Sequence, residues 1–271
     1  MLQPLMLNTF LVLAKTKYFF KVKSWIYSSF LFGLYMSKRI KFFRVHITFS
    51  LIVISLLLCC IFLMWYPAPL HKATGLEHIL FLLILVDVIV GPLLGLLIYK
   101  EGKKTLKFDL AIICILQISA FLFGCYHVFK GRPVWVVYSV DQFELIRDNE
   151  VVSKSYQPSF LGPKFVGIQY SNVPQLKQKE MFQELFSGIA LAQDPKNYKK
   201  LSQIKPQLLQ HLQNLEILEK FNPKQQVENV LKKYPEANAW VPLKANAVDM
   251  VVLMDKNSAQ VVKIVDLRPW K

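Results

Sequence analysis

Three long apolar stretches in the first half of the chain constrain the fold more than any other feature. They cover residues 46–66, 77–99 and 108–129. A helix rises about 1.5 Å per residue, so roughly 20 apolar residues cross the hydrocarbon core of a bilayer. Buried helices of a soluble core seldom stay apolar over such a length. We therefore predict three transmembrane helices within residues 46–129.

Residues 130–271 have the mixed composition of a water-soluble domain. The segments 133–140, 143–146 and 165–170 are rich in β-branched and aromatic residues and predict strands. Two further β-rich runs around residues 255–258 predict a hairpin at the end of the chain. About 140 residues are enough for one α+β domain with its own core.

Helical spacing of apolar residues predicts three helices in the same half. The first covers residues 173–192, and the second covers 205–221 with a single stripe of leucines. Asn222 and Pro223 predict the N-cap and first turn of a third helix that runs to about Tyr234. The predicted fold class is a membrane protein with three transmembrane α-helices followed by a periplasmic α+β domain.

The distribution of basic residues predicts how the chain crosses the membrane. Eight lysines and arginines precede the first apolar stretch, and four lie between the second and the third. Only Lys72 lies between the first and the second. Cytoplasmic flanks carry the excess of basic residues, so the N-terminus and the second loop are expected in the cytoplasm. Three crossings of a bacterial inner membrane then place residues 130–271 in the periplasm.

The formal net charge of +15 does not indicate nucleic-acid binding. Residues 1–129 contribute +9 of it, because 13 lysines and arginines there face four acids. The remaining charge is spread over the second half without a basic stripe, whereas nucleic-acid binding requires a cluster. The excess is explained by the flanks of the membrane helices, and the expected non-protein contact is the lipid bilayer.

The first 35 residues are apolar and basic and contain no acid. They could form an amphipathic helix in the membrane interface. Alternatively, translation starts at Met36, where "MSKR" opens an ordinary cytoplasmic flank, and we favour this interpretation. Residues 1–45 as a whole are expected to be a basic, apolar cytoplasmic segment.

No motif in the sequence indicates catalysis. The zinc-protease, nucleophile-elbow, phosphate-loop and dinucleotide patterns are missing from the sequence. His71, His78 and His127 are expected near the same membrane face, but their spacing matches no metal-ligand pattern. All four cysteines lie in the first and third apolar stretches, where we expect free thiols. We therefore assign no catalytic, cofactor-binding or metal-binding residues.

The second apolar stretch carries one unusual face, in the segment "VDVIVGPLLG" over residues 86–95. Asp87, Gly91 and Gly95 recur every four residues and share one side of a helix. Two glycines at this spacing let another helix approach closely, and Pro92 removes one backbone donor and loosens the turn before it. Asp87, Gly91, Pro92 and Gly95 are our candidates for contact with a partner.

Asp87 is expected about 15 Å from either end of its helix. A carboxylate at that depth costs roughly 3 kcal/mol or more against lipid, so it should face protein or be protonated. Two interpretations remain open. Asp87 packs internally against Ser55, Gln117 or Ser119, or it contacts a partner or handles a proton.

Several blocks in a fixed order carry a family resemblance. They are "WYPAPL", "DVIVGPLLGLLIYKEGK", "LKFDLAIICILQ", "GRPVWVVYSVDQFELI" and the terminal "VDLRPW". Over residues 36–271 the chain resembles the TfpX/TfpZ-type type IV pilin accessory proteins. The resemblance implies an inner-membrane protein that promotes the export, assembly or stability of a pilin. It implies no catalytic residue and no cofactor.

The resulting hypothesis is a non-enzymatic accessory protein for type IV pili. Its expected partners are the pilin and inner-membrane proteins of the assembly machinery. The membrane helices would hold the apolar helix of the pilin, and the periplasmic domain would hold its head. The alternative is a membrane-bound envelope enzyme that modifies the pilin or a lipid-linked substrate. A sensor is a third interpretation, but the cytoplasmic loop is too short for an output domain.

Overall fold

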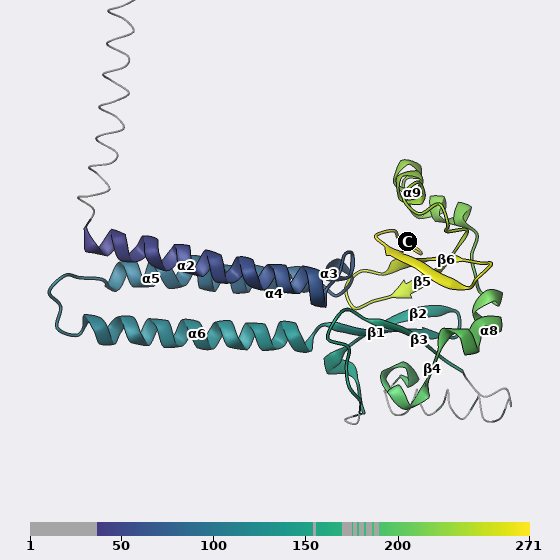
Figure 1. The fold of residues 1–271 in the computed structure, drawn as a ribbon, viewed down its shortest axis with the longest axis horizontal. Helices are drawn as coiled ribbons and strands as arrows, with labels where there is room; N and C mark the ends of the chain where they lie inside the picture. The colour runs from purple at the N-terminus through teal and green to yellow at the C-terminus, as the bar shows by residue number, and fades with distance from the viewer. Residues whose placement is uncertain are drawn as a thin grey trace, which may run out of the picture. The chain divides into compact units, whose positions relative to one another are not determined.

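The computed structural model describes residues 37–153, 156–169 and 190–271, together with Gln175, Gln178, Phe182 and Phe186. In these residues, three long apolar helices are followed by a domain with a mixed β-sheet and short helices (Figure 1). The predicted fold class of three apolar helices followed by an α+β domain is confirmed. The chain divides into two compact units. One joins the residues up to Leu51 with Val88–Leu116, and the other joins Ile52–Asp87 with Gln117–Lys271.

Each of the three long helices is long and apolar enough to cross a membrane. Their lengths are 28, 23 and 25 residues. The first begins eight residues before the predicted apolar stretch, because the basic flank from Lys38 onward is also helical. The first consists of α2 (Lys38–Cys60) and the π-helix η1 (Ile61–Trp65); the second of α4 (Leu76–Ile84), the π-helix η2 (Leu85–Val90) and α5 (Gly91–Ile98); the third is α6 (Leu106–Lys130).

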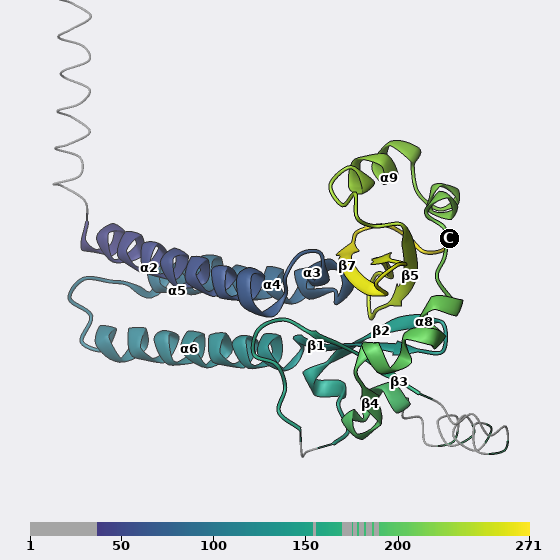
Figure 2. The ribbon, with the colours of Figure 1, turned by 45° about the vertical axis from the view of Figure 1, so that its right-hand side comes forward.

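In the described residues, the domain is built on a seven-stranded sheet with the order β4-β3-β1-β2-β5-β6-β7. Figure 2 shows this sheet from a second side. β1 pairs antiparallel with β2 and parallel with β3, while β2 pairs parallel with β5. The outer pairs β3–β4, β5–β6 and β6–β7 are antiparallel. The strands are β1 (Pro133–Ser139), β2 (Gln142–Arg147), β3 (Lys164–Ile168), β4 (Tyr198–Lys199), β5 (Ala239–Lys244), β6 (Met250–Asp255) and β7 (Gln260–Val265).

The structure confirms the predicted strands β1, β2 and β3 and the terminal hairpin of β6 and β7. Sequence analysis missed β4 and β5. β4 has two residues and is too short to show a pattern. β5 carries Pro242, which argues against an interior strand because proline cannot donate to the ladder. Pro242 nevertheless lies opposite Val251 in the β5–β6 pair.

The single helix predicted for residues 205–221 is wrong. It is divided into α8 (Lys205–Gln210) and the 3-10 helix η7 (Leu215–Lys220). Between them, Gln213 and Trp240 of β5 exchange backbone hydrogen bonds of 2.9 and 3.0 Å. The break lets the leucines reach two separate cores, because Leu208 packs in one and Leu218 in the other.

The predicted cap at Asn222 is also wrong. The helix α9 (Lys224–Leu231) follows Pro223, and the Asn222 side chain is not bonded to it. The side-chain amide instead donates to the carbonyls of Leu218 and Arg268, at 2.9 and 2.8 Å, and accepts from the Arg268 N–H at 2.7 Å. Asn222 thus joins the chain before α9 to the C-terminal segment.

The remaining predicted helix, residues 173–192, falls largely outside the described residues. Four of its positions are described as helical: Gln175, Gln178, Phe182 and Phe186. At its end, the short 3-10 helix η4 (Leu191–Gln193) is described. The expectations for residues 1–35 also lie outside the described part of the chain.

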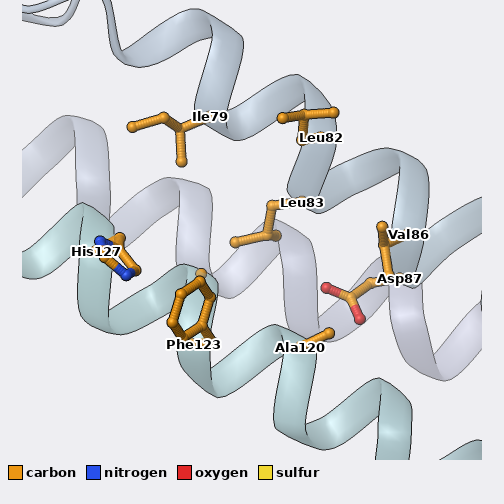
Figure 3. A pocket seen from close by; sticks show the side chains of 9 residues that line it. Ile79, Leu82, Leu83, Val86, Asp87, Ala120, Phe123 and His127 are labelled. Atoms are coloured by element: carbon orange, nitrogen blue, oxygen red, sulfur yellow. The ribbon is translucent and has the colours of Figure 1, made fainter.

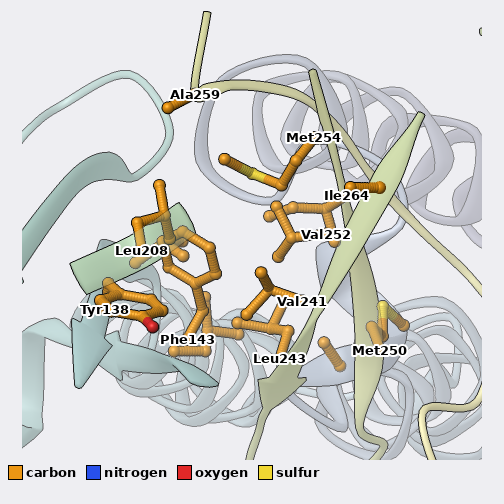
Figure 4. Close-up of a cluster of buried hydrophobic side chains, with 14 of the residues drawn as sticks. Tyr138, Phe143, Leu208, Val241, Leu243, Met250, Val252, Met254, Ala259 and Ile264 are labelled. Atoms are coloured by element: carbon orange, nitrogen blue, oxygen red, sulfur yellow. The ribbon is translucent and has the colours of Figure 1, made fainter. Parts of the chain in front are cut away.

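The main core of the domain includes part of the loop between the first two long helices. This loop forms α3 (Leu70–Ala73), and both end residues are buried in the core (3% and 0% exposed). The N–H groups of Ala247 and Val248 donate to the Ala73 carbonyl at 2.9 and 3.3 Å. Figure 4 shows the facing apolar side chains of this core, including Tyr138, Phe143, Leu208, Val241, Leu243, Met250, Val252, Met254 and Ile264.

Candidate functional site

A groove of about 420 Å³ runs between the second and third long helices, along the halves nearer the domain, which are here called their outer halves. One wall comes from α4 and η2, and the other comes from α6 (Figure 3). Figure 3 shows Leu83 and Asp87 pointing from the second helix toward Ala120 and Phe123 of the third. All of its lining residues belong to one compact unit. They are Ile79, Leu82, Leu83, Val86, Asp87, Ala120, Phe123, Gly124 and His127.

The groove follows from helical spacing and from two small residues. The lining residues of each helix recur every three or four positions, which places them on one face. On α6 the small residues are Ala120 and Gly124. A Cβ on Gly124 would lie 2.8 Å from Leu83 Cδ1, so the glycine lets Leu83 pack closely against α6. Small residues four apart allow such close approach of membrane helices.

The mouth of the groove is apolar and open. Ile79, Leu82 and Phe123 are exposed by 42%, 59% and 67%. At the outer end, His127 packs edge-to-face on Phe123, with ring centroids 4.3 Å apart. Among the lining residues, only Asp87 and His127 can carry a charge. The groove therefore fits an apolar segment that brings a polar group to its inner end.

Asp87 forms that inner end, at the midpoint of the Leu76–Ile98 helix and about 17 Å from either end. It is 5% exposed and lies within the π-helix η2. Gln117 of α6 donates a hydrogen bond of 2.9 Å to the Asp87 main-chain carbonyl. Gln117 is one of the three internal partners expected for Asp87.

The widened π-turn lies immediately before Gly91 and Pro92. A proline lacks the N–H that would bond the carbonyl one turn earlier, which favours a local change of helix geometry. π-Helical turns in α-helices occur often at functional sites. The loosened turn expected from Pro92 thus coincides with the position of Asp87.

The other candidate contact residues lie elsewhere. Gly91, Pro92 and Gly95 are buried and belong to the other compact unit. A Cβ on Gly95 would lie 3.0 Å from Phe42 Cε1 of α2 and 3.5 Å from His46 Nδ1. Of the four candidates, Asp87 lines the groove, whereas Gly95 packs against the first long helix of its own chain.

Sequence analysis missed the α6 wall of the groove. Ala120 and Gly124 repeat the small-residue spacing of Gly91 and Gly95, and this signal could have identified them. Phe123 and His127 follow because they share the same helix face. In the described residues, no three His, Cys, Asp or Glu side chains gather as a metal site would require.

Polar contacts join the ends of the long helices to each other and the loop between the first two helices to the domain. The Tyr66 hydroxyl at the end of the first helix donates to the Val128 carbonyl of α6 at 2.8 Å. Within α3, Lys72 forms an ion pair of 2.8 Å with Asp266 at the end of the domain.

A charged cluster lies where α6 enters β1. The side chains of Arg132 and Asp148 are 3% and 4% exposed, and their atoms approach to 3.1 Å. Lys130 and Tyr156 also donate to Asp148, at 3.1 and 2.7 Å. Burial opposes ionisation of Asp148, but the hydrogen bonds from Tyr156 and Lys130 and the charge of Arg132 outweigh it. They hold its pKa below the usual range.

Comparison with known proteins gives relatives by sequence only. No solved structure and no family-level sequence profile matches the chain. The fimbrial assembly protein of Dichelobacter nodosus serogroup I is 29% identical over 229 residues, which cover 79% of this chain and 89% of that protein. The serogroup E1 protein is 28% identical over the same coverage. The protein of serogroups C1 and C2 is 34% identical over 110 residues, which cover 40% of this chain and 84% of that protein. The chain therefore belongs to the fimbrial assembly proteins, a family of type IV pilus biogenesis.

Proposed function

We propose that the protein is a non-enzymatic inner-membrane assembly factor that holds the apolar helix of a type IV pilin subunit in the groove beside Asp87. The observation that carries this proposal is the groove itself. It is open and apolar along the outer halves of two long helices, and it ends at a carboxyl group. Family membership directs the choice of occupant toward a component of the pilus.

The chemistry of the groove defines the segment that it would bind. Between Ile79 and Asp87 the helix rises about 12 Å, which is two turns of a bound helix. Lipid tails fill an apolar groove as well as a protein helix does, so association depends on close packing and polar contacts. Ala120 and Gly124 provide the close packing, and Asp87 provides the polar contact. The occupant is expected to present a hydroxyl, amide or basic group near the bilayer centre.

The domain offers a second contact to the same subunit. The loop that forms α3 contributes Leu70 and Ala73 to the domain core, so the loop and the domain share one side of the membrane. The basic flanks favour the periplasm for that side. A pilin waiting in the inner membrane has its head on the periplasmic side, within reach of the domain. The proposed function is to hold both parts of the subunit until it is passed to the assembly machinery.

The groove can be tested by filling it. Ala120→Phe adds a ring inside the groove and leaves Asp87 unchanged. Ala111→Phe makes the same exchange on the exposed face of the same helix, outside the groove, and is the matched control. We expect Ala120→Phe to lower surface piliation and co-purification of pilin at least tenfold. Ala111→Phe should behave as wild type. Equal binding and piliation in both variants, at equal protein levels, would overturn the proposal.

The rival function, an envelope enzyme that modifies the pilin, makes a different prediction. Deleting the gene should then change the mass of the mature pilin. The assembly factor predicts fewer surface pili and a pilin of unchanged mass. Intact-protein mass spectrometry of pilin from the deletion strain separates the two, because a mass shift would favour the enzyme.

A further inference from the structure

A loop of the domain returns to the end of the first long helix. The Gly162 N–H donates to the Met64 carbonyl at 2.8 Å. A Cβ on Gly162 would lie 3.5 Å from Pro67 Cγ, and the residue has a positive φ of 55°. Glycine adopts this backbone region without strain, which allows the loop to turn at the helix end. The loop is thus held at the last turn of a helix that is apolar enough to span a membrane.

An aromatic cluster forms at this level. The Phe160 ring lies 6.3 Å from Trp65 of η1 and 6.3 Å from Phe129 of α6, measured between ring centroids. Trp65 and Phe129 are themselves 5.1 Å apart. Three segments that are distant in sequence therefore meet where two long helices end. Trp is enriched at the boundary between hydrocarbon and water, which is where Trp65 is expected if the first long helix spans the membrane.

The tip of the loop exposes two large apolar side chains. Phe160 is 54% exposed and Leu161 is 65% exposed. The Phe160 ring packs on Trp65 of η1 and Phe129 of α6, so the tip adjoins apolar residues at the ends of two long helices. All of these residues belong to the same compact unit. Exposed apolar side chains that are held at the ends of two membrane helices are expected to meet the same solvent as those ends, which is lipid.

Local hydrogen bonds prepare the loop backbone for that environment. The Ser159 hydroxyl donates to the Leu161 carbonyl at 3.0 Å, and the Gly162 N–H is bonded to Met64. Irregular backbone is costly in an apolar layer unless its polar groups find partners. Two of these groups at the tip are satisfied within the chain.

We propose that the tip formed by Phe160 and Leu161 inserts into the interfacial layer of the bilayer and forms a membrane contact of the domain, independent of any pilin. Together with the α6–β1 junction, this contact fixes the height of the domain above the membrane. The occupant is lipid because Gly162 and Phe160 hold the tip at the ends of two apolar helices, and its two large side chains are exposed there.

The test places a fluorescent probe at the tip of the full chain in liposomes, without pilin. The four native cysteines are first replaced by alanine. Two variants of this protein then each carry one new cysteine, at Leu161 in the test variant and at Val140 in the control. Val140 is similarly apolar and 43% exposed, but it follows β1 at the end away from α6. An NBD label on each cysteine reports its surroundings. Quenchers are nitroxide groups near the top of the lipid acyl chains and iodide in the water.

The proposal predicts opposite results at the two positions. The label at 161 should be quenched at least threefold more strongly by nitroxide lipid than the label at 140, and at least threefold less by iodide. Iodide quenching of 161 equal to that of 140 would show that the tip lies in water. Shielding of 161 from both quenchers would show that protein covers it. Either result would overturn this proposal, and neither would bear on the proposed binding of a pilin helix in the groove.

Discussion

Replacing Asp148 by alanine is expected to loosen the junction between α6 and the sheet. Asp148 accepts from Arg132, Lys130 and Tyr156, and its side chain is 4% exposed. The substitution leaves the Arg132 guanidinium buried, with the Phe129 carbonyl at 2.6 Å and the Phe129 ring at 3.8 Å as its remaining contacts. Removing one partner of a buried ion pair costs about 3–5 kcal/mol.

This cost can be measured as a shift of the thermal unfolding midpoint of the full chain in detergent, followed by tryptophan fluorescence. At about 2–4 °C per kcal/mol, the expected decrease is about 6–20 °C. Glu101→Ala is the control. It removes the ion pair of Lys38 and Glu101, whose side chains are 78% and 51% exposed, and is expected to cost under about 1 kcal/mol. Equal shifts for Asp148→Ala and Glu101→Ala would refute the reasoning.

The same network predicts a dependence on pH. The pKa of Asp148 is lowered in the folded protein, so its contribution is present at any pH above the unfolded value of about 3.9. This contribution is lost as the pH falls through the lower, folded pKa. The difference in midpoint between wild type and Asp148→Ala should thus be constant from pH 8 to pH 5 and decrease only below about pH 4. A difference that already disappears at pH 6 would contradict the direction of the shift.

Two further substitutions test the packing of the unit that joins Ile52–Asp87 with Gln117–Lys271. Tyr66→Phe removes the donor to the Val128 carbonyl and is expected to lower the free energy of unfolding by about 1–3 kcal/mol; an unchanged urea midpoint would contradict this. Gly167→Val places a Cβ 1.9 Å from Ile204 Cδ1 and 2.9 Å from its Cγ1, so overpacking should cost about 1–3 kcal/mol. A urea midpoint of Gly167→Val equal to that of the wild type would contradict this expectation.

Local sequence patterns predicted the helices and strands that are determined by residues close together in the sequence. The long helices follow from apolar length, and the β6–β7 hairpin follows from two β-rich runs around a polar turn. The helix predicted for 205–221 failed because Gln213 bonds to Trp240, a contact between distant segments. Asn222 resembled an N-cap but bonds to Arg268, 46 residues away. No local pattern contains that information.

The sequence signal for the candidate site is strong on one side and weak on the other, where the spacing of Ala120 and Gly124 does not say which helix packs against them. A carboxylate in an apolar helix identifies Asp87 without knowledge of its neighbours. Its partner wall requires knowing that α6 lies beside α4, which depends on contacts such as that of Gly124 with Leu83. The burial of Leu70 and Ala73 in the domain core was also unpredictable, because a four-residue helix in a loop shows no pattern.

Site-specific cross-linking tests the central claim, that the groove holds a pilin helix. A photoreactive phenylalanine analogue is placed at position 123 or at position 122 of the full chain in the host bacterium. Phe123 lines the groove and Leu122 does not. The two residues are neighbours in α6 and are similarly exposed, by 67% and 60%, so Leu122 is the matched control. The account predicts a pilin adduct from position 123 at least tenfold more abundant than from position 122. Equal adducts from both positions, or none from position 123 in cells that contain pilin, would contradict it.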